Sequence, residues 1–263
     1  MIKYETLFEL ESPEPLAVPP ELASGYGNLR LPEKGWYGNF VCSLDGVVAF
    51  GKHQGAAGRL ISGASEADRF LMGVLRASSD AIVIGAGTLR AEPQHLWTPA
   101  RVFPSAEGLY DSLRRHLKLP LSPPQLYVVT ASGDLDPGHP VFGAGAIVLT
   151  TAGGIDRLPA GLRPSARVIP GDGAVAALDL ADVVAHDGHR RVLTEGGPAL
   201  MGSLLDAGCV DQLFLTLSPV VAGGGKERQR FSGSFEFLPN QGRWGRLVSL
   251  RRCADMLFLQ YAF

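Results

Sequence analysis

Short, almost wholly apolar runs recur along most of the chain, and stretches with helical periodicity separate several of them. The run AIVI at 81–84 contains no polar residue and ends at Gly85, which is typical of a strand covered on both faces. The preceding stretch 64–79 repeats its apolar residues at helical spacing, and Ser62 or Ser65 can serve as its N-cap. The same patterns predict compact strands at 126–129, 147–149, 168–169 and 192–193, and helices at 175–186 and 198–207.

A longer strand is predicted at 36–43, where it runs into the turn Leu44-Asp45-Gly46 and continues in 47–50. Alternating strands and helices followed by a terminal hairpin predict an α/β fold with three layers, α/β/α. Its sheet is expected to be mixed and mostly parallel, with a C-terminal antiparallel hairpin. The segments that close the chain are the predicted strands 212–218, 246–252 and 256–262, of which the last two form the hairpin.

The first 35 residues differ from the rest because five prolines forbid long regular elements there. We therefore expect an N-terminal arm at 1–35, in which a short helix can form, wrapped around a single domain at 36–263. Within that domain, the segment 92–124 is predicted to be rich in loops, which in a compact domain is typical of a functional or mobile region. The prolines of the arm are Pro13, Pro15, Pro19, Pro20 and Pro32.

Composition narrows the class of protein. The 263 residues are 46% hydrophobic, which is enough to bury a substantial core, and the formal net charge of −2 gives no support for nucleic-acid binding. Three isolated cysteines, with no CxxC pair, no secretory leader and no apolar run of membrane length, predict a reduced, soluble, cytoplasmic protein that is not bound to a membrane. The densest basic group is predicted to be a solvated helix face; it comprises Arg114, Arg115, His116 and Lys118.

Spacing excludes several familiar chemistries. The run GGGK at 223–226 is not a P-loop, because Glu227 follows the lysine. The chain has no GxSxG, no HExxH and none of the HxE and PCxxC spacing of zinc deaminases. Its six histidines are scattered singly, so no metal site is expected. The glycines at 85–88 follow a strand but lack the third glycine of a dinucleotide fingerprint.

Three glycine-bearing segments remain, each at the end of an apolar strand, where α/β sheets bind ligands. They are SLDG at 43–46, GAGTLRAE at 85–92 and TEGGPAL at 194–200. In the third, a strand ends in Glu195, two glycines allow close approach of a ligand, and a helix beginning at Pro198 offers free N–H groups to a phosphate. The alternative is a tight strand-to-helix turn in which Glu195 is an ordinary capping group.

In this order, and together with VVTAS at 128–132 and SPVVAGG at 218–224, these motifs resemble the C-terminal reductase domain of the bacterial riboflavin-biosynthesis deaminase/reductase. The resemblance covers roughly residues 36–262. It implies a dihydrofolate-reductase-like fold and a small-molecule substrate. It also implies NADPH-dependent hydride transfer to a phosphoribosylamino-pyrimidine, the activity of a 5-amino-6-(5-phosphoribosylamino)uracil reductase. It further implies a homodimer, and because no deaminase domain precedes the motifs we expect a stand-alone reductase.

The resemblance also implies roles for residues of this chain. Ser132 would lie near the 2′-phosphate of NADPH, and the helix beginning at Pro198 would hold its other phosphates. Glu195, then Glu92, then Asp45 would face or orient the substrate, and such a carboxylate can relay a proton if burial raises its pKa. The predicted NADPH-binding residues are Gly85, Thr88, Ser132, Gly196, Gly197, Pro198, Ala199 and Leu200, and the predicted substrate-binding residues are Asn39, Ser62 and Arg69.

The chain departs from the family around the expected substrate phosphate. Asn39 stands where the family usually has a lysine, Glu92 is followed directly by proline, and 94–101 lacks the usual arginine. Because these losses remove cations, Arg59, Arg69 and Arg90 are the candidates for compensation. Two alternatives therefore stay open: a reductase of a dihydropteridine such as dihydrofolate, and a non-catalytic NADPH-binding relative. The carboxylates at 45, 92 and 195 argue against the second alternative.

Overall fold

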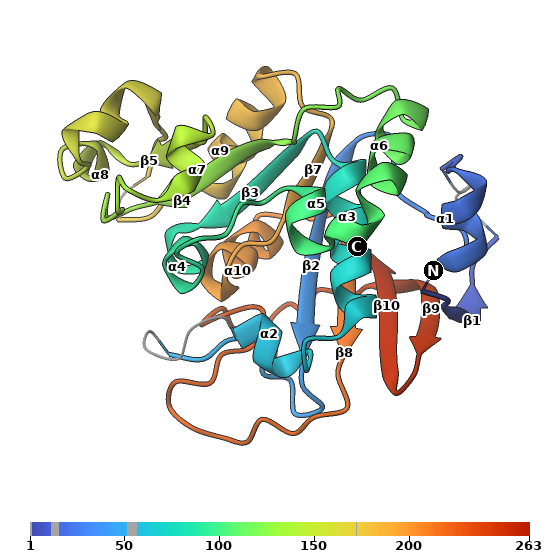
Figure 1. Cartoon of the computed structure of the whole chain (residues 1–263). Helices are drawn as coiled ribbons and strands as arrows, with labels where there is room; N and C mark the ends of the chain where they lie inside the picture. Colours follow the sequence, from blue (N-terminus) through green and yellow to red (C-terminus); the bar gives the residue numbers. More distant parts are fainter. Residues whose placement is uncertain (1, 12–15, 52–56, 172) are drawn as a thin grey trace.

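The computed structural model describes residues 2–11, 16–51, 57–171 and 173–263. Within them, ten strands form one mixed sheet in the order β1-β9-β10-β8-β2-β7-β3-β4-β5-β6, with helices on both faces (Figure 1). In the same residues, no helix is both long enough and apolar enough to cross a membrane. The predicted α/β fold class, with its mostly parallel mixed sheet and C-terminal hairpin, is confirmed.

Strands β8, β2, β7, β3, β4, β5 and β6 are neighbours that run parallel, whereas β10, β9 and β1 continue the sheet in antiparallel pairs. Parallel strands all end at the same edge, here called the carboxyl edge. The strands are β1 Glu5–Glu9, β2 Gly35–Cys42, β3 Ala81–Gly85, β4 Gln125–Thr130, β5 Ile147–Thr150, β6 Ala166–Val168, β7 Arg191–Thr194, β8 Gln212–Leu217, β9 Arg246–Cys253 and β10 Met256–Ala262.

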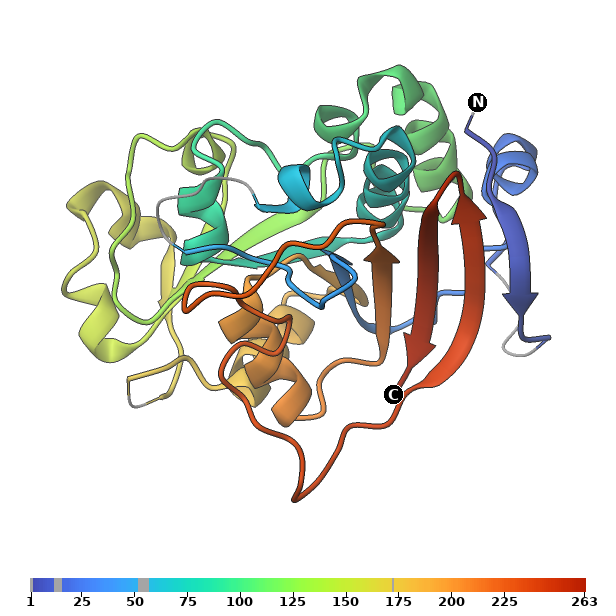
Figure 2. The same cartoon turned by 90° about the horizontal axis from the view of Figure 1, so that it is seen from below.

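Helices α3, α5 and α6 cover one face of the sheet and α9 and α10 the other, as both views show (Figures 1 and 2). A helix that links two parallel strands runs back against them, so α3 and α10 both begin at the carboxyl edge. The helices are α1 Pro20–Gly25, α2 Ala57–Ile61, α3 Glu66–Ser78, α4 Ala86–Ala91, α5 Pro99–Val102, α6 Glu107–His116, α7 Pro140–Gly143, α8 Ala152–Ile155, α9 Ala177–His186 and α10 Pro198–Asp206, with 3₁₀ turns at Pro104–Ala106 and Ala160–Ser165.

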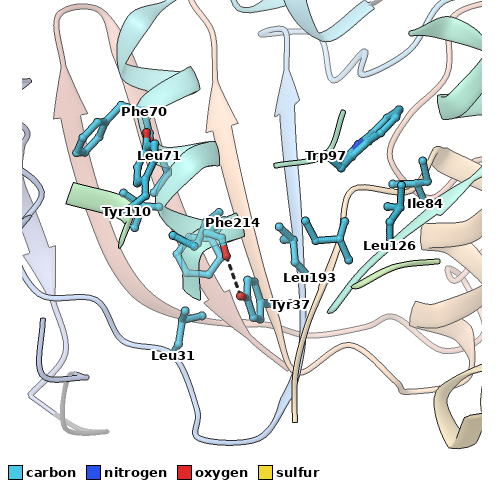
Figure 3. Packing of buried hydrophobic residues seen from close by; sticks show 14 of the residues in the cluster. Leu31, Tyr37, Phe70, Leu71, Ile84, Trp97, Tyr110, Leu126, Leu193 and Phe214 are labelled. Atoms are coloured by element: carbon cyan, nitrogen blue, oxygen red, sulfur yellow. Dashed lines mark hydrogen bonds between the residues drawn. The ribbon is translucent and has the colours of Figure 1, made fainter. Parts of the chain in front are cut away.

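Two hydrophobic cores lie on the two faces, and period-2 alternation assigns strand residues to them. Ile82 and Ile84 of β3 pack in the core under α3, whereas Ala81 and Val83 pack under α9 and α10. Figure 3 shows Tyr37 with Leu193 and Phe214 in the first core, where the Tyr37 hydroxyl donates to the Leu75 carbonyl over 3.0 Å. This bond fixes α3 over β2, the central strand of the site described below.

Most predicted elements are confirmed within a residue or two, and three expectations need correction. Residues 47–50 form no strand; only Ala49 makes an isolated bridge, to Gln229, because the chain has turned away from the sheet. The segment 92–124 is not mainly loop, since α5 and α6 pack on α3 and the Tyr110 hydroxyl donates to the Phe70 carbonyl. Arg114 is not solvated: it is buried and donates to the carbonyls of Ala77, Ser79 and Pro120.

The N-terminal arm is built into the sheet. β1 pairs with β9 as an edge strand, and Leu22 of α1 is buried in the core with Tyr4 and Tyr26. Arg251 of β9, which is fully buried, donates to the carbonyls of Tyr26 and Asn28 and to the carboxylate of Glu9. One guanidinium therefore anchors the arm to the sheet.

Replacing Arg251 by leucine is expected to lower the free energy of unfolding by about 3 kcal/mol, because buried carbonyls and the Glu9 carboxylate lose their donor. Chemical denaturation followed by circular dichroism measures the loss. The matched control is Arg252→Leu, which breaks an exposed pair with Glu5 and should cost less than about 1 kcal/mol. Equal losses in the two variants would contradict the anchoring role.

Candidate functional site

The candidate site lies at the carboxyl edge, where β2, β7 and β3 end beside one another. β2 ends at Cys42 and runs into the turn at 43–46, β7 is followed by Glu195, and β3 ends at Gly85. Figure 2 looks at the molecule from the side of this edge, across which the segment after β8 passes. The three segments singled out from the sequence are thus brought to one edge.

A buried ion pair occupies the centre of this region. Arg76 of α3 donates from Nε to Glu195 Oε1 over 2.8 Å and from Nη2 to Glu195 Oε2 over 2.6 Å. The two side chains are 2% and 9% exposed, so the pair is shielded from water. Such a two-point contact fixes both the position and the plane of the carboxylate. Glu195 therefore faces the site in one orientation.

The remaining nitrogen of Arg76 reaches the segment between α4 and α5. Nη1 lies 3.0 Å from His95 Nε2 and 3.2 Å from the Thr98 carbonyl. A guanidinium only donates, so Nε2 of His95 must accept and the proton of the ring must be on Nδ1. Burial and the adjacent Arg76 lower the pKa of His95 to about 3, so the ring is neutral.

Glu92, which follows α4, is a second carboxylate near this pair. Burial raises its pKa, while Arg76 and Arg59 lower it and Glu195 raises it further. Its backbone carbonyl lies 3.0 Å from His139 Nε2, which anchors the main chain and leaves the side chain half-buried. Glu92 and Glu195, both predicted to face the substrate, are therefore close enough to affect each other's charge.

Asp45 is placed differently. Its side chain is exposed, and it accepts hydrogen bonds from the Ser43 hydroxyl (2.5 Å) and from the backbone N–H groups of Ala222 (3.0 Å) and Gly223 (2.8 Å). The Ser43 bond, followed by these backbone donors, lowers the pKa of Asp45 to about 2. Both oxygens are occupied, so the geometry gives Asp45 the role of joining the turn after β2 to the segment after β8.

Strand register places further polar groups on the face under α3. Asn39 of β2 lies beside Phe214 of β8. Two residues further along β2, Val41 lies beside Thr216 of β8. The polar side chains of Asn39 and Thr216 therefore lie on the same face of the sheet as Tyr37. Gly38 lies beside Thr194, which brings Asn39 level with Glu195. Asn39 is 9% exposed. The predicted substrate residue Asn39 thus lies on the floor of the site next to Glu195.

Asp68, in the first turn of α3, covers this floor. Its carboxyl group is buried, faces the Thr216 hydroxyl and lies near enough to Glu195 to respond to its charge. Burial raises the pKa of Asp68 to about 6, with Glu195 adding to the rise and Thr216 and Arg69 opposing it. We call the five residues that meet here the inner polar cluster: Asn39, Asp68, Arg76, Glu195 and Thr216.

The segment predicted to bind NADPH lies beside this cluster. Gly197 is the N-cap of α10, no side chain caps the helix, and its first turn has no acidic residue. Gly85, at the end of β3, lies close to Gly197: a Cβ atom added to Gly85 would be 4.0 Å from the Gly197 nitrogen. A Cβ atom added to Gly197 would be 3.3 Å from Thr88 Oγ1. The structure thus brings Gly85, Thr88 and the start of α10 together around uncapped N–H groups, which suits an anion.

Ser132 lies at the end of β4, two strands from β7 in the sheet. It is exposed, its hydroxyl accepts from the Asp134 N–H, and its carbonyl accepts from Arg157 Nε over 2.7 Å. Arg90 of α4 donates to the Asp134 carbonyl, so two exposed cations flank this turn. The predicted neighbourhood of the 2′-phosphate therefore contains two arginines, of which Arg90 also lies 3.9 Å from the carboxylate of Asp134.

The other two predicted substrate residues are not members of the cluster, although Arg69 lies near enough to Asp68 to lower its pKa. Ser62 lines a hollow of about 530 Å³ together with Ser218 and Cys253, on the side of the arm. The guanidinium of Arg69 lies 5.9 Å from the ring of Phe103, between α3 and the segment after α5. Neither position supplies a cation or hydroxyl to Glu195.

Sequence reasoning did not identify Asp68, Arg76 and His95. The signal for the first two was present: they are eight residues apart, so they share one face of the predicted helix, and that face is the apolar one. A charged residue on a buried face requires a partner, although the sequence alone does not say which one. His95 carried no pattern of its own.

The buried acid gives the protein a specific dependence on pH. Because the pKa of Asp68 is raised above its unfolded value, the stability it contributes is complete at low pH and is lost as the pH rises through about 6. Asp68→Asn removes that loss, so the variant should exceed the parent in unfolding free energy by up to about 3 kcal/mol near pH 8, and by almost nothing below about pH 4. Urea denaturation across this range measures the difference.

The matched control for that series is Glu66→Gln, which changes an exposed carboxylate in the same helical turn. Its difference from the parent should stay small at every pH. A constant offset for Asp68→Asn across the series would mean that the Asp68 carboxyl group does not titrate as its burial requires.

Comparisons with known proteins bear on the fold and the family of the chain. None of the curated proteins matches the sequence. Among solved structures, a pyrimidine reductase-like protein from Corynebacterium diphtheriae gives a TM-score of 0.67 at 22% identity, covering 90% of this chain and 96% of that one. The riboflavin biosynthesis reductase of Saccharomyces cerevisiae gives 0.57 at 15% identity, covering 90% and 93%. At these identities the likeness shows a shared fold.

RibD from Acinetobacter baumannii gives a TM-score of 0.63 at 18% identity; the alignment covers 92% of this chain but 60% of that longer one. A family model described as the RibD C-terminal domain matches residues 38–243, which is well over half of the sequence and includes most of β2 and all of β3, β7 and β8. The chain therefore belongs to the RibD C-terminal domain family.

Proposed function

We propose that the protein is an NADPH-dependent reductase that transfers hydride to a C=N bond in, or attached to, a nitrogen heterocycle. The observation that carries this proposal is the meeting of the uncapped start of α10 with the buried Arg76–Glu195 pair at one edge. The start of α10 supplies an anion site, and the Arg76–Glu195 pair supplies a carboxylate of fixed orientation. Membership of the RibD C-terminal domain family supports the proposal, and it points to 5-amino-6-(5-phosphoribosylamino)uracil as the substrate.

The residues present fit a dinucleotide phosphate. Gly197 and Gly85 leave the backbone of two adjoining turns without side chains, and no carboxylate stands in the first turn of α10 to repel an anion. Residues Gly196–Leu200 with Gly85 and Thr88 would hold the cofactor, and Ser132 with its neighbouring arginines would meet the 2′-phosphate. Bound there, NADPH supplies the hydride; the protein supplies position and charge.

The inner polar cluster would orient the heterocycle. Glu195 is held by two hydrogen bonds from Arg76, so its carboxylate is available to a ring N–H without being free to rotate. Asn39 offers both a donor and an acceptor on the same floor. Asp45 would keep the segment after β8 in place across the edge, which limits entry of water.

One observation favours a second substrate class. Asn39 is neutral where the family usually has a lysine, and Arg76 is already neutralised by Glu195, so the described part of the cluster has no spare cation for a phosphate. A dihydropteridine such as dihydrofolate would present its ring to the same cluster and needs no phosphate site there. The two substrate classes share a flat heterocycle and differ in what is attached to it.

The assay that separates them follows NADPH oxidation by absorbance, with the deaminated phosphoribosylamino-uracil and dihydrofolate offered in parallel. We expect oxidation with the pyrimidine if Arg59, near Glu92 at the rim, binds the phosphate. Oxidation only with dihydrofolate would assign the second class. NADPH binding without oxidation of either would mean a non-catalytic relative and would contradict the proposal.

Gly197→Val tests the cofactor site. A branched side chain at the N-cap covers the free N–H groups, so the dissociation constant for NADPH should rise about tenfold or more. Backbone strain is not expected, because Gly197 has φ −63°. Fluorescence titration measures affinity, and Gly108→Val at the open start of α6 on the opposite face is the control. An unchanged affinity for Gly197→Val would place the phosphates elsewhere.

A further inference from the structure

Asp68 is a buried acid with no structural duty that the described residues reveal. It is 5% exposed, and no Lys, Arg or His of the described residues forms an ion pair with it. Buried carboxylates are normally paired or hydrogen-bonded several times over, because isolation in the interior is costly. An acid kept at such a cost is a candidate for function.

Helix capping does not explain it. Asp68 stands three residues after the N-cap Ser65, where an acidic side chain often accepts from the N-cap N–H. Here the Ser65 N–H donates to the Ser62 carbonyl instead, and the only capping bond runs from the Asp68 N–H to the Ser65 hydroxyl. That bond uses the backbone of Asp68, so any residue at this position could make it.

The groups around the carboxyl come from four segments. Thr216 of β8 faces it, Glu195 after β7 repels its negative form, Arg69 lies next in α3, and Tyr4 of the arm is close enough to sense its charge. The Tyr4 hydroxyl is already committed to the Ala67 carbonyl over 2.5 Å. Because Tyr4 is committed, the carboxyl of Asp68 has one hydroxyl neighbour, Thr216, and one repelling carboxylate, Glu195. The fourth neighbour, Arg69, places its guanidinium near the ring of Phe103.

Asp68 lies in the first turn of α3, at the same edge of the sheet as Glu195. α3 begins at the carboxyl edge, and Asp68 in its first turn lies near enough to Thr216 and Glu195 to respond to both. A heterocycle lying on the floor of the site would be within reach of the Asp68 carboxyl. The other carboxylates are less suited to give a proton, because both oxygens of Glu195 accept from Arg76 and those of Asp45 accept from Ser43 and two backbone N–H groups.

We propose that Asp68 binds the nitrogen of the substrate C=N bond as a carboxylic acid and donates its proton there during reduction, an assignment that rests on the proposed function. Hydride from NADPH adds to the carbon and forms the new C–H bond. The π pair of the C=N bond moves to nitrogen, which takes the proton as the O–H bond of Asp68 breaks. The products are the amine and NADP⁺, and the Asp68 carboxylate regains a proton from solvent. Substrates are therefore unprotonated imines of a nitrogen heterocycle.

The first test is the pH profile of turnover. The parent should lose activity as the pH rises through about 6, because the acid ionises. Asp68→Asn keeps the shape of the side chain but cannot donate, so kcat near pH 6 should fall about 100- to 1000-fold and the alkaline fall should disappear. Affinity for NADPH should stay within about twofold. Glu66→Gln, an exposed neighbour in the same turn, should match the parent throughout.

A substrate that needs hydride but no proton separates chemistry from folding. An N-methylated iminium form of the heterocycle has no lone pair to protonate, so Asp68→Asn should reduce it at a rate within a few-fold of the parent. A variant damaged only in structure would lose both activities. Measuring both activities in Glu92→Gln provides a comparison with a carboxylate that is half-buried.

A third readout does not depend on turnover. Binding of the heterocycle without NADPH near pH 7 should take up about one proton, because Asp68 must be protonated to bind the ring nitrogen. Calorimetry in two buffers of different ionisation enthalpy measures this uptake. Asp68→Asn should show none.

The outcomes are distinguishable. An active parent with an equally active Asp68→Asn, an unchanged pH profile and unchanged proton uptake would overturn this assignment while leaving the proposed function intact. Loss of both the imine and the iminium activities in Asp68→Asn would give Asp68 a structural role and would also overturn the assignment of Asp68 as proton donor. A parent that binds NADPH and reduces no C=N substrate would overturn the proposed function, and this assignment with it.

Discussion

The buried pair between Arg76 and Glu195 is the interaction on which the site depends. One guanidinium ties the C-terminal half of α3 to the residue after β7 and, through its third nitrogen, to the segment that leads into α5. Burying two charges is costly, and the cost is offset because each of the three side-chain nitrogens of Arg76 has an acceptor. Burial, followed by repulsion from Arg76, lowers the pKa of His95 and keeps its ring neutral.

The direction of the helices explains why the groups proposed to bind substrate and cofactor lie at one edge of the sheet. Helices that link parallel strands run back against them, so α3 and α10 start at the same edge although they cover opposite faces. The start of α10 contributes free N–H groups, and the first turn of α3 contributes an acid. Both helix starts therefore lie at the carboxyl edge, on either side of the residue after β7.

Periodicity in the sequence was sufficient for the parts of the fold that are apolar. It located β3, α3, α10 and the closing hairpin, because each buries a regular set of hydrophobic side chains. It missed β1, whose residues are mostly exposed at the sheet edge, and α6, whose few apolar residues are separated by charged ones. These two elements are fixed by partners far along the chain, β9 and α3, which a local pattern does not contain.

The same limit applies to the site. Glu195 and the glycines after it carried a local signature, since a strand, a turn and a helix follow in a few residues. Arg76 stands 119 residues away from Glu195, and the meeting of Asp68 with Thr216 depends on the register of β2 against β8. Such contacts follow from topology, so the motifs identified the carboxylates Glu195, Glu92 and Asp45, and the structure was needed to find Arg76, which holds the first of them.

Charge within the inner polar cluster bears on how a substrate would lie. Its one cation is matched by Glu195, and Asp68 adds an acid, so the cluster is at best neutral and becomes negative when Asp68 ionises. An anionic tail would be repelled there and attracted to the rim, where Arg59 acts on Glu92. A flat ring with N–H donors and a basic nitrogen suits the interior. The cluster would therefore select the ring, and the rim would select what the ring carries.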